Sequence, residues 1–182
     1  MGSRGDPLDE VGLRAAAAHA REEWRADEQH WSAAALEQWR HTRTLVDLAR
    51  DHLHRGDTIA LRWPGATAAV AGRVVGVSGD AVAVATFAGR VDVALAPGAA
   101  ISWRIVESAT RGGSRGITPL TFRARLLELE SLACEVDVAH LDGEIVRGVL
   151  CVGHDHVQVV APGASWMIAL SALRWVRESS PA

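Results

Sequence analysis

One pattern in the sequence occurs twice, and it constrains the fold more than any other feature. Residues 74–84 align with residues 149–159: in both stretches apolar residues lead into a tight turn that ends in an aspartate, and valines at every second position follow it. Further along, Trp103 aligns with Trp175. A duplication of this kind predicts two copies of one small unit, each built from strands that bury one face.

Both copies are predicted to contain five short strands, because period-two alternation is interrupted at regular intervals by turn residues. Asp142-Gly143 is the strongest hairpin signal in the chain. The predicted strands are residues 59–63, 67–77, 81–87, 91–95 and 101–106 in the first copy, and 135–140, 144–152, 156–161, 166–170 and 174–177 in the second.

A helix is expected before each copy. Residues 9–54 are rich in alanine and contain no proline, with Gly56 as the stop signal and a possible break near residues 40–44. Thr118 followed by Pro119 is a good start for a second, short helix, with Thr118 as the N-cap.

The predicted fold class is therefore α+β: an N-terminal helical arm followed by two tandem five-stranded small β-barrels, the second preceded by its own short helix. The expected segments are a disordered tail at 1–8, the arm at 9–54, the first barrel at 55–107, a Gly/Arg linker at 108–117, and the helix with the second barrel at 118–178. Both functional hypotheses below assume that each copy closes its own interior, and a single continuous sheet would remove that basis.

The glycine-containing second strand and the turn after it resemble the Sm-like (SH3-like) small-barrel proteins, nearest the C-terminal barrel of the bacterial small-subunit ribosome maturation factor. The stretches that carry the resemblance are residues 72–82 and 148–157. The resemblance implies a small-barrel fold and a link to RNA. Classical Sm proteins read bases with an Asn and an Arg-Gly pair, and Ala83, Gln158 and Arg104-Ile105 stand near those positions here, so no base pocket is carried over.

Charge is distributed unevenly along the chain. The net charge is −3, all 19 basic residues are arginine, and the middle third, residues 53–117, carries +3. A polyanion is therefore expected to dock on that third. Two cysteines make no disulfide framework, and no apolar run is long enough to span a bilayer, so a cytoplasmic protein with no membrane contact is expected.

Six arginines are the candidate nucleic-acid contacts. Arg62, Arg73 and Arg104 would form a phosphate-binding patch if they projected from one outer face, and arginines flanked by glycine can reach phosphates from a flexible linker. The alternatives are a solvated barrel surface with internal ion pairs, and an ordinary tether. RNA or ribosomal RNA is the expected partner, ahead of DNA. The full set is Arg55, Arg62, Arg73, Arg104, Arg111 and Arg115.

Trp24, Trp31 and Trp39 lie on the helical arm, and Trp24 and Trp31 are seven residues apart and so share a face. Bulky aromatics on an alanine-rich helix predict packing against something large. We expect residues 9–54 to self-associate or to dock on a protein partner. The alternative function is therefore a protein–protein interaction scaffold that uses the arm and the barrel edges without nucleic acid.

The sequence contains no catalytic motif, and a non-enzymatic adaptor without cofactors is the resulting hypothesis. A zinc site could be assembled from Cys151, His154 and His156, with Cys134 and His140 nearby, but a convincing second ligand pair is absent. A core thiol with solvated turn histidines is the favoured interpretation, and no metal is expected.

Overall fold

A computed structural model of the chain describes residues 7–95, 100–109, 112–113, 121–141 and 143–179. The chain divides into two compact units, Met1–Arg43 and Thr44–Ala182. Residues 1–6 of the predicted tail lie outside the described residues, whereas Pro7 and Leu8 already belong to the first helix.

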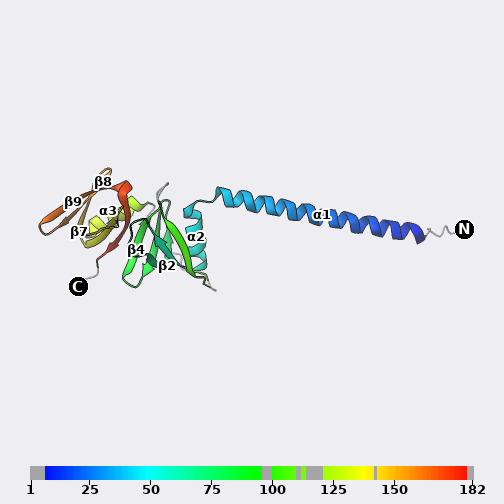
Figure 1. The fold of residues 1–182 in the computed structure, drawn as a ribbon, viewed down its shortest axis with the longest axis horizontal. Helices are drawn as coiled ribbons and strands as arrows, with labels where there is room; N and C mark the ends of the chain where they lie inside the picture. The colour runs from blue at the N-terminus through cyan, green and yellow to red at the C-terminus, as the bar shows by residue number, and fades with distance from the viewer. Residues whose placement is uncertain (1–6, 96–99, 110–111, 114–120, 142, 180–182) are drawn as a thin grey trace. The chain divides into compact units, whose positions relative to one another are not determined.

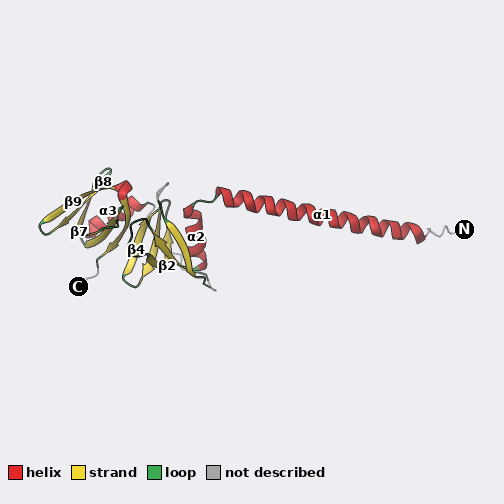
Figure 2. Cartoon of the chain, viewed as in Figure 1, coloured by secondary structure: helices red, strands yellow, loops and turns green. Residues whose placement is uncertain are grey.

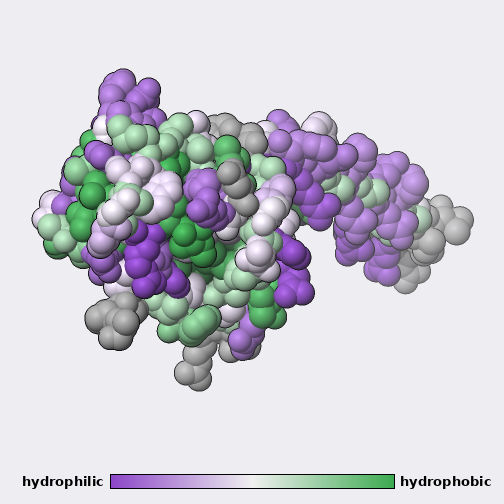
Figure 3. Space-filling model, turned by 60° about the vertical axis from the view of Figure 1, so that its left-hand side comes forward, coloured by the Kyte–Doolittle hydropathy of each residue, from purple (hydrophilic) through white to green (hydrophobic). Residues whose placement is uncertain are grey.

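The first unit contains one helix, α1 (Pro7–Thr42). Alanine and long polar side chains favour this conformation, and the chain has no proline between Pro7 and the end of the helix. Figure 3 shows α1 as hydrophilic over nearly all of its visible surface. Among the described residues, no helix combines the length and the apolar character that crossing a membrane requires.

The second unit begins with α2 (Leu45–Arg55), whose two ends are capped by local sequence. The Thr44 side chain accepts a hydrogen bond from the Asp47 N–H, and the Asp47 carboxylate accepts one from the Thr44 N–H, which together form a capping box. Gly56 ends the helix with φ +79°, a conformation that glycine adopts readily. The helix buries Ala49, His52 and Leu53.

The ten strands agree closely with the predicted segments, because the period-two pattern and the turn residues fix them locally. Figure 2 shows them in yellow beside the helices. Their bounds are β1 (Thr58–Arg62), β2 (Val70–Val77), β3 (Ala81–Thr86), β4 (Gly89–Ala94), β5 (Ser102–Glu107), β6 (Glu135–His140), β7 (Ile145–Val152), β8 (His156–Ala161), β9 (Ala164–Ala169) and β10 (Leu173–Glu178).

The α+β class is confirmed, but two separate closed barrels are not. All ten strands belong to one open antiparallel sheet in the order β5-β1-β2-β3-β4-β10-β6-β7-β8-β9 (Figure 1). The halves are joined where β4 pairs with β10, and β5 and β9 are the two ends of the sheet. Small barrels have strands with unpaired backbone groups at their edges. Here the N–H and C=O groups at one edge of each half form hydrogen bonds with the other half, through the pairing of β4 with β10. This single sheet removes the basis that both functional hypotheses took from two separately closed interiors, and a function must instead be argued from the faces of one sheet.

Two apolar cores lie on this sheet, and each includes residues from both halves. Trp175 and Ala139 of the second half belong to the core of the first half. Ala81 and Ala94 of the first half belong to the core of the second. The reason is the alternation along β10: Trp175 lies opposite Val93, whereas its neighbour Val176 points into the other core. The halves are consequently packed as one body.

Gly72 and Gly148 identify the equivalent positions of the two halves. A side chain at either glycine would collide with a backbone carbonyl of the neighbouring strand, at 2.1 and 2.4 Å respectively. Gly72 lies opposite Ile59 in β1, and Gly148 lies opposite Val136 in β6. Strand β1 of the first half therefore corresponds to β6 of the second half, with Ile59 and Val136 at equivalent positions.

This correspondence corrects the sequence alignment of the two tryptophans. Trp103 lies opposite Leu61, the counterpart of Val138, and Val138 lies opposite Val176. Trp175 instead lies opposite Ala139, one position further along. A register shift between Leu173 and Trp175 produces the displacement, which pattern matching along one strand cannot detect.

A third helix, α3 (Phe122–Leu132), follows the linker. Its N-cap is Thr121, whose hydroxyl accepts a hydrogen bond from the Ala124 N–H. The predicted cap, Thr118, lies outside the described residues. Asp80, in the β2–β3 turn of the first half, accepts a hydrogen bond from the Phe122 N–H at 2.6 Å. The start of α3 is therefore held by the first half, although the helix packs on the core of the second.

A buried ion-pair network reinforces the junction. Arg125 of α3 is 6% exposed, and it donates to Asp92 of β4 and to Glu178 of β10, at 2.9 Å in each case. Arg90 donates to the same Asp92 at 2.7 Å. Burial disfavours the charged guanidinium, but its bonds to Glu128, Asp92 and Glu178 outweigh this effect and raise the pKa of Arg125. One cation thus links α3 to both strands of the junction.

We expect Arg125→Met to lower the free energy of unfolding by about 3–5 kcal/mol, because it leaves the Asp92 carboxylate buried beside one remaining cation. Urea unfolding followed by tryptophan fluorescence measures the change. Arg123→Met, two residues away on the same helix, is the matched control and should change it by less than about 1 kcal/mol. The double variant Asp92→Asn/Arg125→Met should recover part of the loss, and equal losses in Arg125→Met and Arg123→Met would contradict the role of the network.

Candidate nucleic-acid interface

Three of the candidate arginines lie on one face of the sheet. Thr58 lies opposite Arg73, Ala60 lies opposite Arg104, and Thr58, Ala60 and Arg62 alternate along β1. Residues opposite each other in an antiparallel pair project to the same side, as do alternate residues of one strand. Arg62, Arg73 and Arg104, here called the arginine face, therefore share the side opposite the buried core.

All three side chains of the arginine face are exposed, and none forms a hydrogen bond or ion pair with another described residue. Thr58 and Arg62 are four residues apart on β1, which spreads the face over roughly 13 Å at a rise of about 3.3 Å per residue. Glu107 lies opposite Thr58 and places one carboxylate at the Arg73 end. The face is thus positive over most of its length.

The corresponding face of the second half is neutralised. By the glycine correspondence, Asp137 occupies the position of Ala60. Its carboxylate accepts hydrogen bonds from Arg147 at 2.7 Å, Arg177 at 2.9 Å and Ser179 at 2.9 Å. Burial opposes ionisation of Asp137, but these bonds outweigh it and lower its pKa. On this side, Arg147 and Arg177 of the second half are therefore paired with a carboxylate, whereas Arg62, Arg73 and Arg104 of the first half are not.

Arg55 is engaged in a different role. Its Nε donates to Asp57 at 2.8 Å, and the buried Asp57 carboxylate also lies 2.7 Å from Nδ1 of His52 and accepts a bond from the Ala109 N–H at 3.0 Å. This cluster joins the end of α2 to β1 and to the segment that follows β5. Arg55 is half-exposed and is the partner of a buried carboxylate, and it therefore differs from the three other described candidates, which have no ion pair.

The described part of the linker lies beside the arginine face. Gly112 and Arg73 line the same polar depression, and the Gly113 N–H donates to the His54 carbonyl at 2.9 Å. A side chain at Gly113 would lie 1.9 Å from the Leu53 carbonyl oxygen, so only glycine permits this approach. The two linker candidates, Arg111 and Arg115, lie outside the described residues.

The arm tryptophans are exposed. Trp24 and Trp31 are each 74% exposed and Trp39 is 50% exposed. The guanidinium of Arg43 lies 4.0 Å from the centre of the Trp39 ring, a cation–π contact within the first unit. Within α1, Trp24 and Trp31 therefore form an aromatic pair on one side of the helix that is available to a partner.

The cysteines and histidines considered for zinc are dispersed. The expected core thiol is wrong for Cys151, which is exposed because it lies on the outward-facing side of the alternating strand β7. Cys134 is half-buried after α3, and His154 is exposed in the β7–β8 turn. His156 bonds Asp155 at 2.8 Å. In the part of the chain that the structure describes, no three histidine, cysteine or acidic side chains come close enough to hold a metal ion.

Sequence reasoning did not identify Arg125 or an apolar groove between the two halves. Arg125 and Asp92 are distant in sequence and meet only through tertiary contact. One signal for the groove was present, because Phe87 is a large apolar residue in the turn between β3 and β4, where polar residues are usual, and it is fully exposed.

The free energy of unfolding depends on pH through the Asp57 carboxylate and its hydrogen-bond partners His52, Arg55 and Ala109. Burial raises the pKa of Asp57, but hydrogen bonds from His52, Arg55 and Ala109 outweigh it and lower the pKa from 3.8 to about 2. The charged carboxylate therefore stabilises the fold fully above pH 3.8, and this contribution is lost as the pH falls through about 2.

We expect Asp57→Asn to unfold more easily than the original chain at pH 7, by about 2 kcal/mol, with the difference shrinking between pH 4 and pH 2. Urea unfolding at a series of pH values measures it. Asp27→Asn, which changes an exposed carboxylate of α1, is the control and should show no such trend. A difference between Asp57→Asn and the original chain that stays constant down to pH 2 would contradict the assignment.

Comparison with known proteins assigns no family to the chain. No protein-family model matches it, and neither the curated proteins nor the solved structures contain a match. The likeness to Sm-like small barrels consequently remains an expectation from the sequence. Function has to be argued from the residues described above.

Proposed function

We propose that the protein is a non-enzymatic adaptor that binds nucleic acid, RNA before DNA, through phosphate contacts on the arginine face. The observation that carries this proposal is the register that aligns Arg62, Arg73 and Arg104 on one side of β2-β1-β5 without a described ion pair. Guanidinium groups bind phosphates strongly, and each phosphate contact releases counterions. Backbone contacts of this kind position a strand without reading its sequence.

The difference between the two halves supports the same proposal. A general surface requirement for arginine would apply to both halves, but in the second half Asp137 neutralises Arg147 and Arg177. The first half has Ala60 in place of that carboxylate. The first half thus keeps Arg62, Arg73 and Arg104 without a described ion pair, and the segment that contains it, residues 53–117, carries a net +3.

We further propose that the two halves are copies of one Sm-like small-barrel plan joined edge to edge. The strand order β5-β1-β2-β3-β4 of the first half corresponds to β10-β6-β7-β8-β9 in the second. Each half is preceded by a helix with a threonine N-cap, Thr44 or Thr121. Gly72 and Gly148 meet the neighbouring strand in the same way.

The test is fluorescence polarisation of a labelled, mixed-sequence single-stranded RNA. We expect binding that weakens steeply between about 50 and 200 mM salt. Arg73→Gln/Arg104→Gln should weaken it at least about tenfold and reduce the slope of log affinity against log salt by about 2.

The matched control is Arg50→Gln/Arg123→Gln, which removes the same charge from the two helices of the compact unit. It should leave the salt slope nearly unchanged. The proposal fails if the original chain does not bind RNA at low salt. It also fails if the two double variants lose affinity equally, because a diffuse positive field and not the arginine face would then explain the binding.

The second candidate function is a protein-interaction scaffold. Two surfaces favour it: the exposed Trp24 and Trp31 on α1, and the unpaired edge strands β5 and β9. Ile105 and Val106 are exposed on β5 and Met167 is exposed on β9, so both edges combine free backbone groups with apolar side chains.

Sedimentation velocity of the full chain, before and after nuclease treatment, tests this candidate. We expect a concentration-dependent increase in mass that nuclease does not remove and that Trp24→Ala/Trp31→Ala abolishes. Arg25→Ala/Ser32→Ala changes another side of the same helix and should preserve the association. Met167→Lys separately tests the β9 edge, since an edge lysine opposes strand addition. The scaffold function is excluded if the chain is monomeric at all concentrations and retains no protein partner after nuclease treatment.

A further inference from the structure

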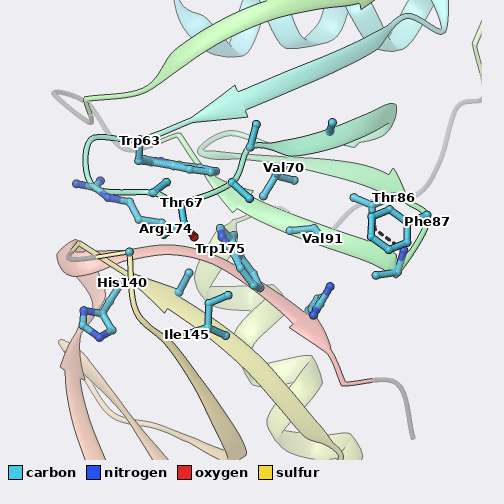
Figure 4. Close-up of a pocket in the computed structure, with 18 residues that line it drawn as sticks. Trp63, Thr67, Val70, Thr86, Phe87, Val91, His140, Ile145, Arg174 and Trp175 are labelled. Atoms are coloured by element: carbon cyan, nitrogen blue, oxygen red, sulfur yellow. Dashed lines mark hydrogen bonds between the residues drawn. The ribbon is translucent and has the colours of Figure 1, made fainter. Parts of the chain in front are cut away.

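An apolar groove runs between the two halves within the compact unit. Figure 4 shows Trp63 and Arg174 at one end of it and Phe87 at the other, with Trp175 and Val91 between them and Ile145 below. The first half contributes Trp63, Phe87 and Val91, and the second contributes Ile145, Arg174 and Trp175. The cavity measures about 290 Å3.

The groove follows from the junction of β4 and β10. One face of β10 carries Trp175. This face packs into the core of the first half, and the same face is the outer surface of the second half. Apolar residues of both halves are therefore brought to one surface. Phe87 is fully exposed at its rim and Ile145 is 53% exposed on its floor. Exposed apolar side chains gathered in a concave site are typical of a ligand pocket.

The Trp63 end of the groove has donors without acceptors. Among the described residues, three buried side-chain donors have no hydrogen-bond partner, and two of them, Nε of Arg174 and Nε1 of Trp63, belong to residues that line the groove. Trp63 is only 5% exposed, and Arg174 forms no ion pair with a described residue. Buried polar groups are nearly always satisfied, so unsatisfied donors on two lining residues indicate that an acceptor belongs beside them.

The other charged side chains of the groove already have partners. Arg177 donates to Asp137 at 2.9 Å, and the His140 ring lies 3.6 Å from Glu144. An incoming anion would therefore be directed to Arg174 and not to Arg177. The groove combines one available cation with apolar walls.

We propose that this groove binds a small aromatic monocarboxylate, with its ring against Trp175 and Ile145 and its carboxylate on Arg174. A volume of about 290 Å3 lies at the lower limit of small-molecule pockets, which suits a ligand of one or two rings. The carboxylate provides the acceptor that the donors lack, and a charge-assisted bond to guanidinium is among the stronger polar contacts available. This site is independent of the arginine face.

The test compares two probes of the same shape, 2-naphthoate and the neutral 2-naphthamide, by isothermal titration calorimetry on the full chain. We expect one equivalent of 2-naphthoate to bind at least about tenfold more tightly than 2-naphthamide, as one charge-assisted hydrogen bond would give. The indole N–H signals of Trp63 and Trp175 should shift in NMR spectra during the titration, while those of Trp24 and Trp31 stay in place.

Variants locate the anion contact. Arg174→Gln should remove the preference for 2-naphthoate, and Arg174→Lys should retain part of it. The control Arg123→Gln removes an arginine outside the groove and should leave the preference unchanged. Ile145→Glu changes an exposed floor residue, which the fold should tolerate, and should weaken both probes.

Three results would overturn the proposal. They are equal binding of the two probes, a preference for 2-naphthoate that survives Arg174→Gln, and binding that shifts the arm tryptophans but not Trp63 or Trp175. If Arg174→Gln fails to fold by circular dichroism, the comparison of Arg174→Lys with Ile145→Glu decides between the groove and another site.

Discussion

Pairing of β4 with β10 is the constraint on which the rest of the compact unit depends. It satisfies backbone groups that would otherwise be exposed at one edge of each half, and it places Asp92 and Glu178 on adjacent strands. Two carboxylates brought together in this way repel each other unless a cation lies between them, and Arg125 of α3 supplies it at 2.9 Å from both. The helix, the two strands and the two cores are therefore parts of one interaction.

The junction also changes what each side of the sheet faces. A side chain on β10 that points outward from the second half points into the core of the first half. This is why Trp175 belongs to a core that is built mainly from residues of the first half. The same geometry gathers apolar residues of both halves around a groove whose polar end contains Arg174. The groove between the halves is thus a consequence of joining them, and neither half could form it alone.

One position accounts for a difference in charge between the outer faces of the two halves. Ala60 and Asp137 occupy equivalent places, yet Ala60 leaves Arg104 without an ion pair, whereas Asp137 binds Arg147 and Arg177. A single carboxylate is enough because it lies between the two guanidinium groups and is largely shielded from water, so its attraction for them is weakly screened. The two halves therefore share a strand order and differ in the charge that their outer faces expose.

The sequence by itself determined the local elements. Alternation of apolar residues specified ten strands to within a few residues, Gly56 and Thr44 specified the ends of α2, and Gly72 and Gly148 specified where two strands approach closely, because these signals act over a few neighbouring residues. It also identified the three arginines, although not their common face, which needs the strand register. The tertiary structure alone decided that the halves share one sheet, that Trp103 and Trp175 are not equivalent, and that Arg125 meets Asp92. These outcomes depend on which free edge pairs with which, and period-two patterns carry no information about partners distant in the chain.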